Sequence, residues 1–168
     1  EGLPLNTLYI LDYAGVERET GKSQWWKYVP EVKDPETEEV LEAAKWEKTS
    51  DFGSIASDQD SKKLFDSTLA DVFGGFTTTL YAYGFDLSIA FDYQLGGTTI
   101  DGAYAGSMNN STASSLGKNY HLDLLDAWDK ETNPDSNIPR FQYATENQSA
   151  TSTRFLIDAS YLNIQNLT

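Results

Sequence analysis

The residue types that perform catalysis are scarce in this chain. Its 168 residues include one histidine and no cysteine, against 26 Asp and Glu. The single histidine, His121, cannot be assigned to a Ser/His/Asp triad, and no thiolate chemistry is possible without cysteine. Acidic pairs are abundant by composition alone, so they do not indicate a glycosidase, whose two carboxylates are recognised by their separation in space. We therefore expect no enzyme and no catalytic residues.

Metal and phosphate sites are also unsupported by the sequence. Residues 58–63 contain an Asp-x-Asp, but neither the glycine nor the distal glutamate of a calcium loop follows. The pairs Gly74-Gly75 and Gly96-Gly97 interrupt strand-like segments, and no lysine of a phosphate-binding loop follows either pair. We expect no bound metal and no cofactor.

Aromatic side chains are the remaining candidates for ligand contact. The sequence has 10 Tyr, 8 Phe and 4 Trp, and Trp25, Trp26 and Tyr28 lie close together. Aromatic rings suit the C–H faces of sugars, while packing within a loop and placement at a membrane boundary are the competing interpretations. The candidate contacts with a substrate or a partner are Trp25, Trp26, Tyr28 and Trp128.

Two aspartates, Asp86 and Asp92, lie in the segment with the clearest periodicity. Within residues 85–95 every odd position is apolar, and these positions hold Phe85, Leu87, Ile89, Phe91, Tyr93 and Leu95. Strict alternation predicts a β-strand with one apolar and one polar face. In a soluble sheet the apolar face packs on a core, whereas in an outer-membrane barrel it meets lipid and the polar face meets the lumen.

Three features favour the membrane interpretation of this strand. Its length of about 11 residues matches the roughly 9–11 that cross a bilayer when tilted. Tyr81, Tyr83 and Tyr93 lie near strand ends, where interfacial aromatics are common. The turn at Gly84 is short while other connections are long, as in outer-membrane barrels. We therefore expect the six odd-numbered side chains to face lipid, and Asp86 and Asp92 to face the lumen.

Charge and hydropathy argue against nucleic acid or anionic lipid as a partner and against a membrane helix. The net charge of -14, from 12 Lys and Arg against 26 Asp and Glu, repels nucleic acid phosphates and anionic lipid headgroups. No run of residues approaches the roughly 20 apolar positions of a membrane helix. The chain starts at Glu1 with neither an initiator methionine nor a signal peptide, so we expect a mature product or a piece of a longer protein.

The overall pattern predicts an all-β chain of antiparallel strands with long polar loops and short helical turns. We expect a hairpin formed by residues 76–83 and 85–95, and a strand near the C-terminus within residues 153–167. Apolar spacing predicts a short helix over residues 37–48 and a helical turn over residues 122–128. No repeat or linker divides residues 1–168, which we treat as one segment.

Four groups of residues resemble motifs of one transporter family. Residues 74–97 carry Gly-Gly-Phe, then Tyr-Gly-Phe-Asp-Leu, then Gly-Gly. Residues 124–140 carry Leu-Leu-x-x-Trp, Asn-Pro and Ile-Pro-Arg, and residues 154–166 carry Arg-Phe-Leu followed by Ser-Tyr-Leu. Residues 3–22 resemble a strand that ends in a Thr-Gly turn. In this order the motifs resemble the SusC-like TonB-dependent transporters, the RagA/SusC group, although Asn163 stands where arginine is usual.

This resemblance implies a fold, a function and partners. The chain would be a partial outer-membrane β-barrel, because the plug, the TonB-contacting segment and most strands of the family are not in the sequence. The parent would be an outer-membrane importer of glycans or peptides, would draw energy from TonB and would work with a SusD-like surface lipoprotein. Its long loops would be extracellular and would contact substrate or that lipoprotein.

A second function class stays open from the residues. The same alternating strand would suit a free-standing soluble β-domain that binds carbohydrate or a protein partner at the cell surface. Dependence on detergent distinguishes the two, because the apolar face of a soluble domain is covered by its own core.

Overall fold

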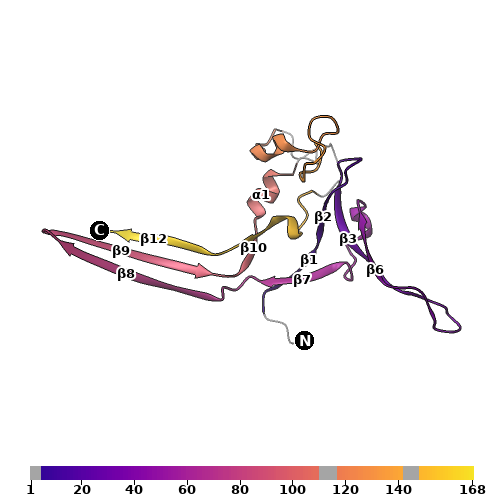
Figure 1. The fold of residues 1–168 in the computed structure, drawn as a ribbon, viewed down its shortest axis with the longest axis horizontal. Coiled ribbons are helices and arrows are strands. Elements are labelled where there is room, and N and C mark those ends of the chain that lie inside the picture. The colour runs from indigo at the N-terminus through magenta and orange to yellow at the C-terminus, as the bar shows by residue number, and fades with distance from the viewer. Residues whose placement is uncertain (1–4, 110–116, 142–147) are drawn as a thin grey trace. The chain divides into compact units, whose positions relative to one another are not determined.

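The computed structural model describes residues 5–109, 117–141 and 148–168 (Figure 1). The chain divides into two compact units. The first, here called the sheet unit, comprises the residues up to Leu8 together with Leu64–Ile100 and Leu156–Thr168. The second, here called the loop unit, comprises Tyr9–Lys63 and Asp101–Phe155. Antiparallel strands dominate the described residues and helices are few, which confirms the all-β prediction.

Three strands form the main sheet of the sheet unit. They are β8 (Val72–Ala82), β9 (Phe85–Leu95) and β12 (Tyr161–Leu167), in the order β12-β9-β8. Both pairings are antiparallel, and Figure 1 shows the long β8–β9 hairpin with β12 alongside β9. Strand β9 has the bounds that its alternation predicts, which confirms the hairpin; β8 begins four residues earlier than expected.

A two-residue turn joins β8 to β9. Ala82 pairs with Phe85, and the residues between them have positive φ, 51° at Tyr83 and 84° at Gly84. Two consecutive positive φ values are typical of a type I′ turn, whose twist matches that of the flanking strands. Glycine adopts this conformation freely, whereas Tyr83 is strained there. The predicted turn at Gly84 is confirmed.

A polar corner connects the main sheet to a second strand pair. Strand β10 (Thr98–Ile100) pairs with β11 (Leu156–Asp158). The Asp158 carboxylate accepts hydrogen bonds from the Ser160 amide at 2.8 Å and hydroxyl at 2.6 Å, and these bonds lower the Asp158 pKa. Ser160 Oγ in turn accepts the amide of Gly96 at 2.9 Å. The corner therefore links the ends of β9 and β11 where the chain changes direction.

Strands β1 (Thr7–Leu11) and β7 (Lys62–Ser67) form a separate pair, and the division between the two units falls within both strands. The loop unit contains the sheet β2-β3-β6 and the hairpin β4-β5. These strands are β2 (Tyr13–Val16), β3 (Ser23–Val29), β4 (Val32–Lys33), β5 (Val40–Glu42) and β6 (Lys45–Thr49).

A small hydrophobic core lies within the loop unit. Leu11, Trp25 and Ile55 are buried together, with Tyr13 and Phe52 packed against them. The Trp25 ring meets the Phe52 ring at 5.1 Å between centroids and the Tyr13 ring at 6.2 Å, both in edge-to-face geometry. Edge-to-face contact is a favoured arrangement of aromatic rings. Phe52 is held by the single turn η1 (Phe52–Ser54), which Asp51 caps.

The predicted helix over residues 37–48 is wrong. This segment forms β5, a connection and β6, in which Trp46 lies opposite Tyr28 of β3. The two rings are 5.4 Å apart, so cross-strand contact between aromatic side chains accompanies the strand. The four-residue spacing from Val40 to Ala44 fits a helix locally, but the five residue pairs between β3 and β6 outweigh that preference.

Helical structure is confined to short turns. Besides η1, the described helical elements are α1 (Gly102–Ser107), η3 (Leu122–Asp126) and η4 (Thr153–Phe155). The helical turn expected over residues 122–128 is present as η3, which ends before Trp128. None of the helices in the described parts of the chain has the length and apolar character needed to cross a membrane.

Candidate functional site

The three-stranded sheet presents one continuous apolar face. Residues directly opposite each other on paired strands share a face, and the register places mostly apolar partners beside the odd positions of β9, with Thr78 and Gly74 of β8 as the exceptions. Together the apolar members of this face are Val72, Phe76, Leu80, Ala82, Phe85, Leu87, Ile89, Phe91, Tyr93, Leu95, Leu162, Ile164 and Leu167. Phe76 and Phe91 stack at 4.7 Å between ring centroids, which confirms that they lie on the same side.

None of the described side chains on this apolar face is buried. Phe85 is 79% exposed, Leu80 61% and Leu162 66%. A soluble protein rarely leaves so large an apolar area open to water. The six odd-numbered side chains of β9 are therefore not packed into a core formed by the described residues.

Glycine and tyrosine complement each other on this face. Gly74 lies opposite Tyr93, and a Cβ added to Gly74 would lie 3.1 Å from the Tyr93 hydroxyl oxygen. The ring of Tyr93 therefore covers the position that glycine leaves without a side chain, an arrangement that stabilises glycine in sheets.

The opposite face of the sheet is mainly polar. Asp86, Ser88, Asp92 and Gln94 alternate with the apolar residues of β9, and Thr79 Oγ1 lies 3.5 Å from Ser88 Oγ across the β8–β9 pair. The remaining members of this polar face are Phe73, Gly75, Thr77, Tyr81, Ala90, Tyr161, Asn163 and Asn166. The sheet thus separates a hydrocarbon-like side from one rich in hydroxyl, amide and carboxylate groups.

Asp92 occupies a particular place on the polar face. It lies between Gly75 of β8 and Asn163 of β12. Its Oδ1 atom is buried and has no hydrogen-bond partner among the residues that the structure describes. A buried carboxylate oxygen is costly without a donor, so this position suits a donor that approaches from outside the sheet.

Both edges of the three-stranded sheet are open within the described part of the chain. Strand β9 pairs on both sides, whereas β8 and β12 each pair on one side. Long edge strands with unpaired amide and carbonyl groups readily recruit further strands. In lipid those groups must be paired, which a closed barrel accomplishes.

The predicted aromatic contacts occupy two different environments. Trp25 is 2% exposed and belongs to the core of the loop unit, and Trp128 is 8% exposed. A Cβ added to Gly21 would lie 2.2 Å from the Trp128 ring, so glycine permits that ring to pack. Trp26 and Tyr28 are half-buried.

Two sequence motifs meet around Trp128. Its amide donates to the Ile138 carbonyl at 2.8 Å, and the Arg140 amide donates to the Gly21 carbonyl at 2.9 Å. Arg18 donates to the carbonyls of Pro134 and Ser136 at 3.3 and 3.0 Å. The N-terminal Thr-Gly turn and the Trp–Ile-Pro-Arg segment are thus hydrogen-bonded to each other.

Lysines lie over the half-buried aromatic rings. Lys63 Nζ is 4.3 Å from the centroid of Trp46 and 5.9 Å from that of Trp26, and Lys48 Nζ is 5.3 Å from Trp26. Lys63 also pairs with the Asp12 carboxylate at 2.8 Å. Such cation–π contacts place charge over the ring faces that a sugar would use. Trp26 is therefore less open to stacking than its sequence suggests.

Burial shifts the pKa values of two neighbouring groups in the loop unit. Desolvation raises the pKa of the Tyr13 phenol and lowers the pKa of the Arg154 guanidinium, while the charge of each opposes the shift of the other. Arg154 lies over the Tyr13 and Phe155 rings at 5.4 and 5.0 Å and donates to the Gln148 carbonyl at 3.1 Å. These contacts make Arg154 a packing residue of the loop unit.

His121 and the acidic residues that the structure describes do not assemble into a chemical centre. His121 caps η3 by accepting the Asp123 amide at Nδ1, and its ring meets that of Tyr104 at 4.8 Å. Within residues 5–109, 117–141 and 148–168 no group of three or more His, Asp or Glu side chains is arranged to hold a metal.

Sequence reasoning overlooked one feature of the loop unit. Residues from three separate stretches of the chain line a cavity of about 240 Å³. The lining residues are Tyr9, Ile10, Leu11, Phe52, Ala56, Lys62, Ala150 and Thr151. No local pattern marks them, because the nearest members of the three stretches are about 40 and 90 positions apart.

Solved transporter structures have the same fold over nearly the whole chain. A chain of the RagAB peptide transporter aligns over 98% of this chain with a TM-score of 0.66 and 26% identity. A chain of the RagAB peptide importer in the open-open state aligns over 99% with a TM-score of 0.64 and 24% identity. Neither a protein-family model nor a curated protein matches the sequence.

The alignment covers 17% of each of those two chains, so this chain spans about one sixth of their length. The agreement confirms both the RagA/SusC resemblance and the expected fold, that of antiparallel strands forming part of a barrel.

Proposed function

We propose, taking the chain as SusC/RagA-like in fold, that it forms part of the barrel wall of a TonB-dependent importer in the bacterial outer membrane. The apolar face of β8, β9 and β12 meets lipid in this proposal, and Asp86 and Asp92 face the lumen. The observation that carries it is that no residue of the apolar face is buried and most of its large side chains are exposed, because lipid is the solvent in which such a face is stable. The open edges of β8 and β12 support it, since they provide for pairing with further strands.

Spin labels on single introduced cysteines test the orientation of the sheet. The sequence has no cysteine of its own, so Ile89→Cys and Ser88→Cys each give one label, on adjacent residues of opposite faces. In lipid vesicles we expect the label at position 89 to collide mainly with oxygen, which dissolves in lipid. The label at position 88 should collide mainly with a water-soluble nickel chelate.

The same measurement distinguishes the soluble alternative. A label at position 89 that is shielded from both reagents would indicate a protein core and favour a free-standing β-domain. Extending the labels to Phe91 and Asp92 should reproduce the alternation of accessibility if the face is lipid-exposed.

The cargo proposed for the importer is a peptide or an oligosaccharide, delivered by a SusD-like surface lipoprotein. Peptide is favoured because the similar solved structures are described as a peptide transporter and a peptide importer. Uptake of labelled peptides and of labelled oligosaccharides by cells that carry the importer would decide between them. Uptake should stop when the proton gradient is collapsed. Uptake of both the labelled peptides and the labelled oligosaccharides without TonB would contradict the proposal.

A further inference from the structure

Two adjacent lysines of β7 have different surroundings. The charge of Lys63 is balanced by Asp12 at 2.8 Å and lies over the Trp46 ring. Among the described residues, Lys62 donates to the neutral amide oxygen of Gln59 at 3.3 Å, and its ammonium lies 6.0 Å from the centroid of the Tyr9 ring. Among the residues that the structure describes, no carboxylate forms an ion pair with Lys62. Within the described part of the chain, the positive charge of Lys62 therefore has no carboxylate partner, although the net charge of the chain is -14.

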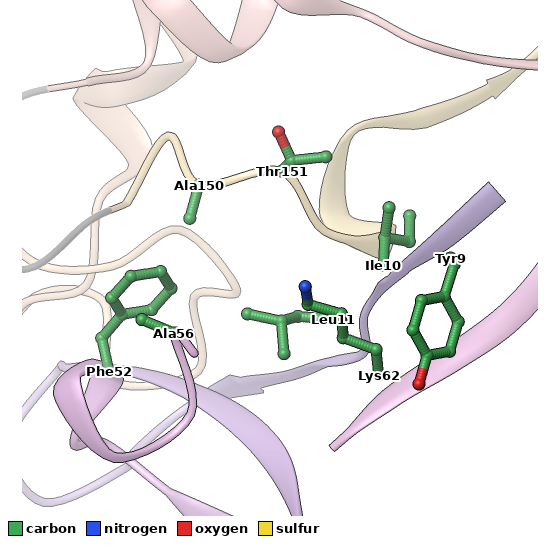
Figure 2. A pocket seen from close by; sticks show the side chains of 8 residues that line it. All are labelled: Tyr9, Ile10, Leu11, Phe52, Ala56, Lys62, Ala150 and Thr151. Carbon is green, nitrogen blue, oxygen red and sulfur yellow. The ribbon is translucent and has the colours of Figure 1, made fainter. Parts of the chain in front are cut away.

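Lys62 lines the cavity of the loop unit. Figure 2 shows the Lys62 side chain reaching in among the lining residues. Ile10, Leu11, Phe52, Ala56 and Ala150 supply apolar walls, while Tyr9 and Thr151 add hydroxyl groups. The cavity thus combines one ammonium group with a mostly hydrocarbon surface.

The walls are held by contacts that do not involve a ligand. Leu11 and Phe52 belong to the hydrophobic core. Leu11 also forms a parallel backbone bridge with Ser152, which holds the neighbouring Thr151 beside β1. The Tyr9 hydroxyl donates to the Gln59 carbonyl. The cavity is therefore formed in advance of any binding, which lowers the entropic cost of binding.

We propose that this cavity binds a monocarboxylate that carries a short aliphatic group, with the carboxylate on Lys62. An ammonium in partly apolar surroundings pairs strongly with one negative charge, and the apolar walls favour hydrocarbon beside it. The cavity has a volume of about 240 Å³. This volume is larger than the roughly 150 Å³ of a protein cavity that accepts benzene, and smaller than the roughly 300 Å³ of the smallest sites that bind drug-sized ligands. A ligand about the size of one amino-acid residue fits these limits.

The inference does not depend on the importer proposal, because it concerns binding by the loop unit alone. Two sources share the required chemistry: the C-terminal residue of a peptide and a free branched-chain fatty acid. N-acetyl-L-leucine represents the first and 4-methylpentanoate the second. Tighter binding of N-acetyl-L-leucine would indicate a peptide terminus, and equal binding would show that the carboxylate and aliphatic group suffice.

The test is a titration of the whole chain with N-acetyl-L-leucine, followed by amide NMR shifts. We expect saturable binding in the millimolar range that shifts the amides of Ile10 and Thr151. The neutral analogue N-acetyl-L-leucinamide should bind at least tenfold more weakly to the unaltered chain. Equal affinity for acid and amide, or no saturable shift with either acid, would overturn the proposal without requiring any variant.

Variants localise the charge. Lys62→Met should weaken binding of the acid at least tenfold, and Lys62→Arg should retain most of it. Lys130→Met removes a charge of the same sign from an exposed loop position and should leave binding unchanged. Equal losses in Lys62→Met and Lys130→Met, with unchanged circular dichroism, would assign the effect to net charge and contradict a site at Lys62.

Discussion

The sheet unit and the loop unit use similar side chains in opposite ways. In the loop unit, Trp25 and Ile55 are buried beside Leu11 and Phe52. In the sheet unit, Phe85 and Leu80 are exposed, and no apolar residue of β8, β9 or β12 is buried. Both units contain aromatic and aliphatic residues on strands, so hydropathy alone does not distinguish them.

The difference shows that the two units require different surroundings. A core that closes on itself is stable in water, because the apolar groups of the folded chain cover one another. A sheet that buries no residue of its apolar face gains stability only when something else removes that face from water. Each unit should therefore respond differently to substitution and to the addition of lipid.

The largest effect is expected from truncating the buried aromatic residue. Trp25→Ala should lower the free energy of unfolding of the loop unit by about 3–5 kcal/mol, because it removes a buried ring and leaves a cavity. Phe85→Ala is the matched change on the open face and should shift stability in water by no more than about 0.5 kcal/mol. Denaturant unfolding followed by circular dichroism measures both. Similar losses for the two variants would remove the distinction between the units.

A smaller effect, which depends on lipid, is expected near the middle of β9. Ile89→Arg should destabilise the chain in phospholipid vesicles by about 2–4 kcal/mol, the cost of an arginine that faces the bilayer interior. Ser88→Arg places the same side chain on the polar face and should cost much less. Urea titration of the vesicle-bound chain gives both values. An equal cost at positions 88 and 89 would contradict the assignment of faces.

The smallest effect is a pH dependence confined to the loop unit. Burial raises the pKa of Tyr13 above its ordinary value of 10.0, so the unfolded chain releases this proton at a lower pH than the folded chain. Stability should therefore decrease as the pH rises above about 10. Tyr13→Phe should reduce this decrease without abolishing it, since burial also raises the pKa of Tyr104.

Tyr83→Phe is the matched control for this pH dependence. Tyr83 is fully exposed and belongs to the sheet unit, so Tyr83→Phe should leave the packing of the loop unit, and with it the decrease at alkaline pH, unchanged. Thermal unfolding between pH 9 and 11 measures the three proteins. An identical decrease in Tyr13→Phe and in the unaltered chain would show that Tyr13 does not contribute.

The sequence predicts the sheet better than it predicts the loop unit. Strand β9 follows from strict alternation, and its turn follows from Gly84, because both signals lie within a few neighbouring residues. The prediction of a helix over residues 37–48 is wrong because the partners that make its strands, such as Tyr28 opposite Trp46, are distant in the sequence. Local patterns cannot reveal such pairings.

The candidate contacts show the same limit. Trp25 and Trp26 are consecutive, yet one is in the core and the other is half-buried beneath lysines. Alternation along β3 gives them opposite faces, but only the packing of Phe52 shows which face is inside. The bulge between Ile164 and Asn166 likewise returns Leu167 to the apolar face out of step with simple alternation. The orientation of Asp86 and Asp92 towards a lumen stays a prediction.

The odd number of strands in the main sheet restricts how copies of the chain can associate. Because β8 and β12 both run antiparallel to β9, the two outer strands point the same way. Copies related by translation would therefore bring β8 against β12 in parallel. When the apolar faces stay on one side, a twofold axis that joins like edges is what preserves the antiparallel ladder. Self-association through these edges would accordingly proceed by symmetric pairs, β8 to β8 and β12 to β12, rather than head to tail.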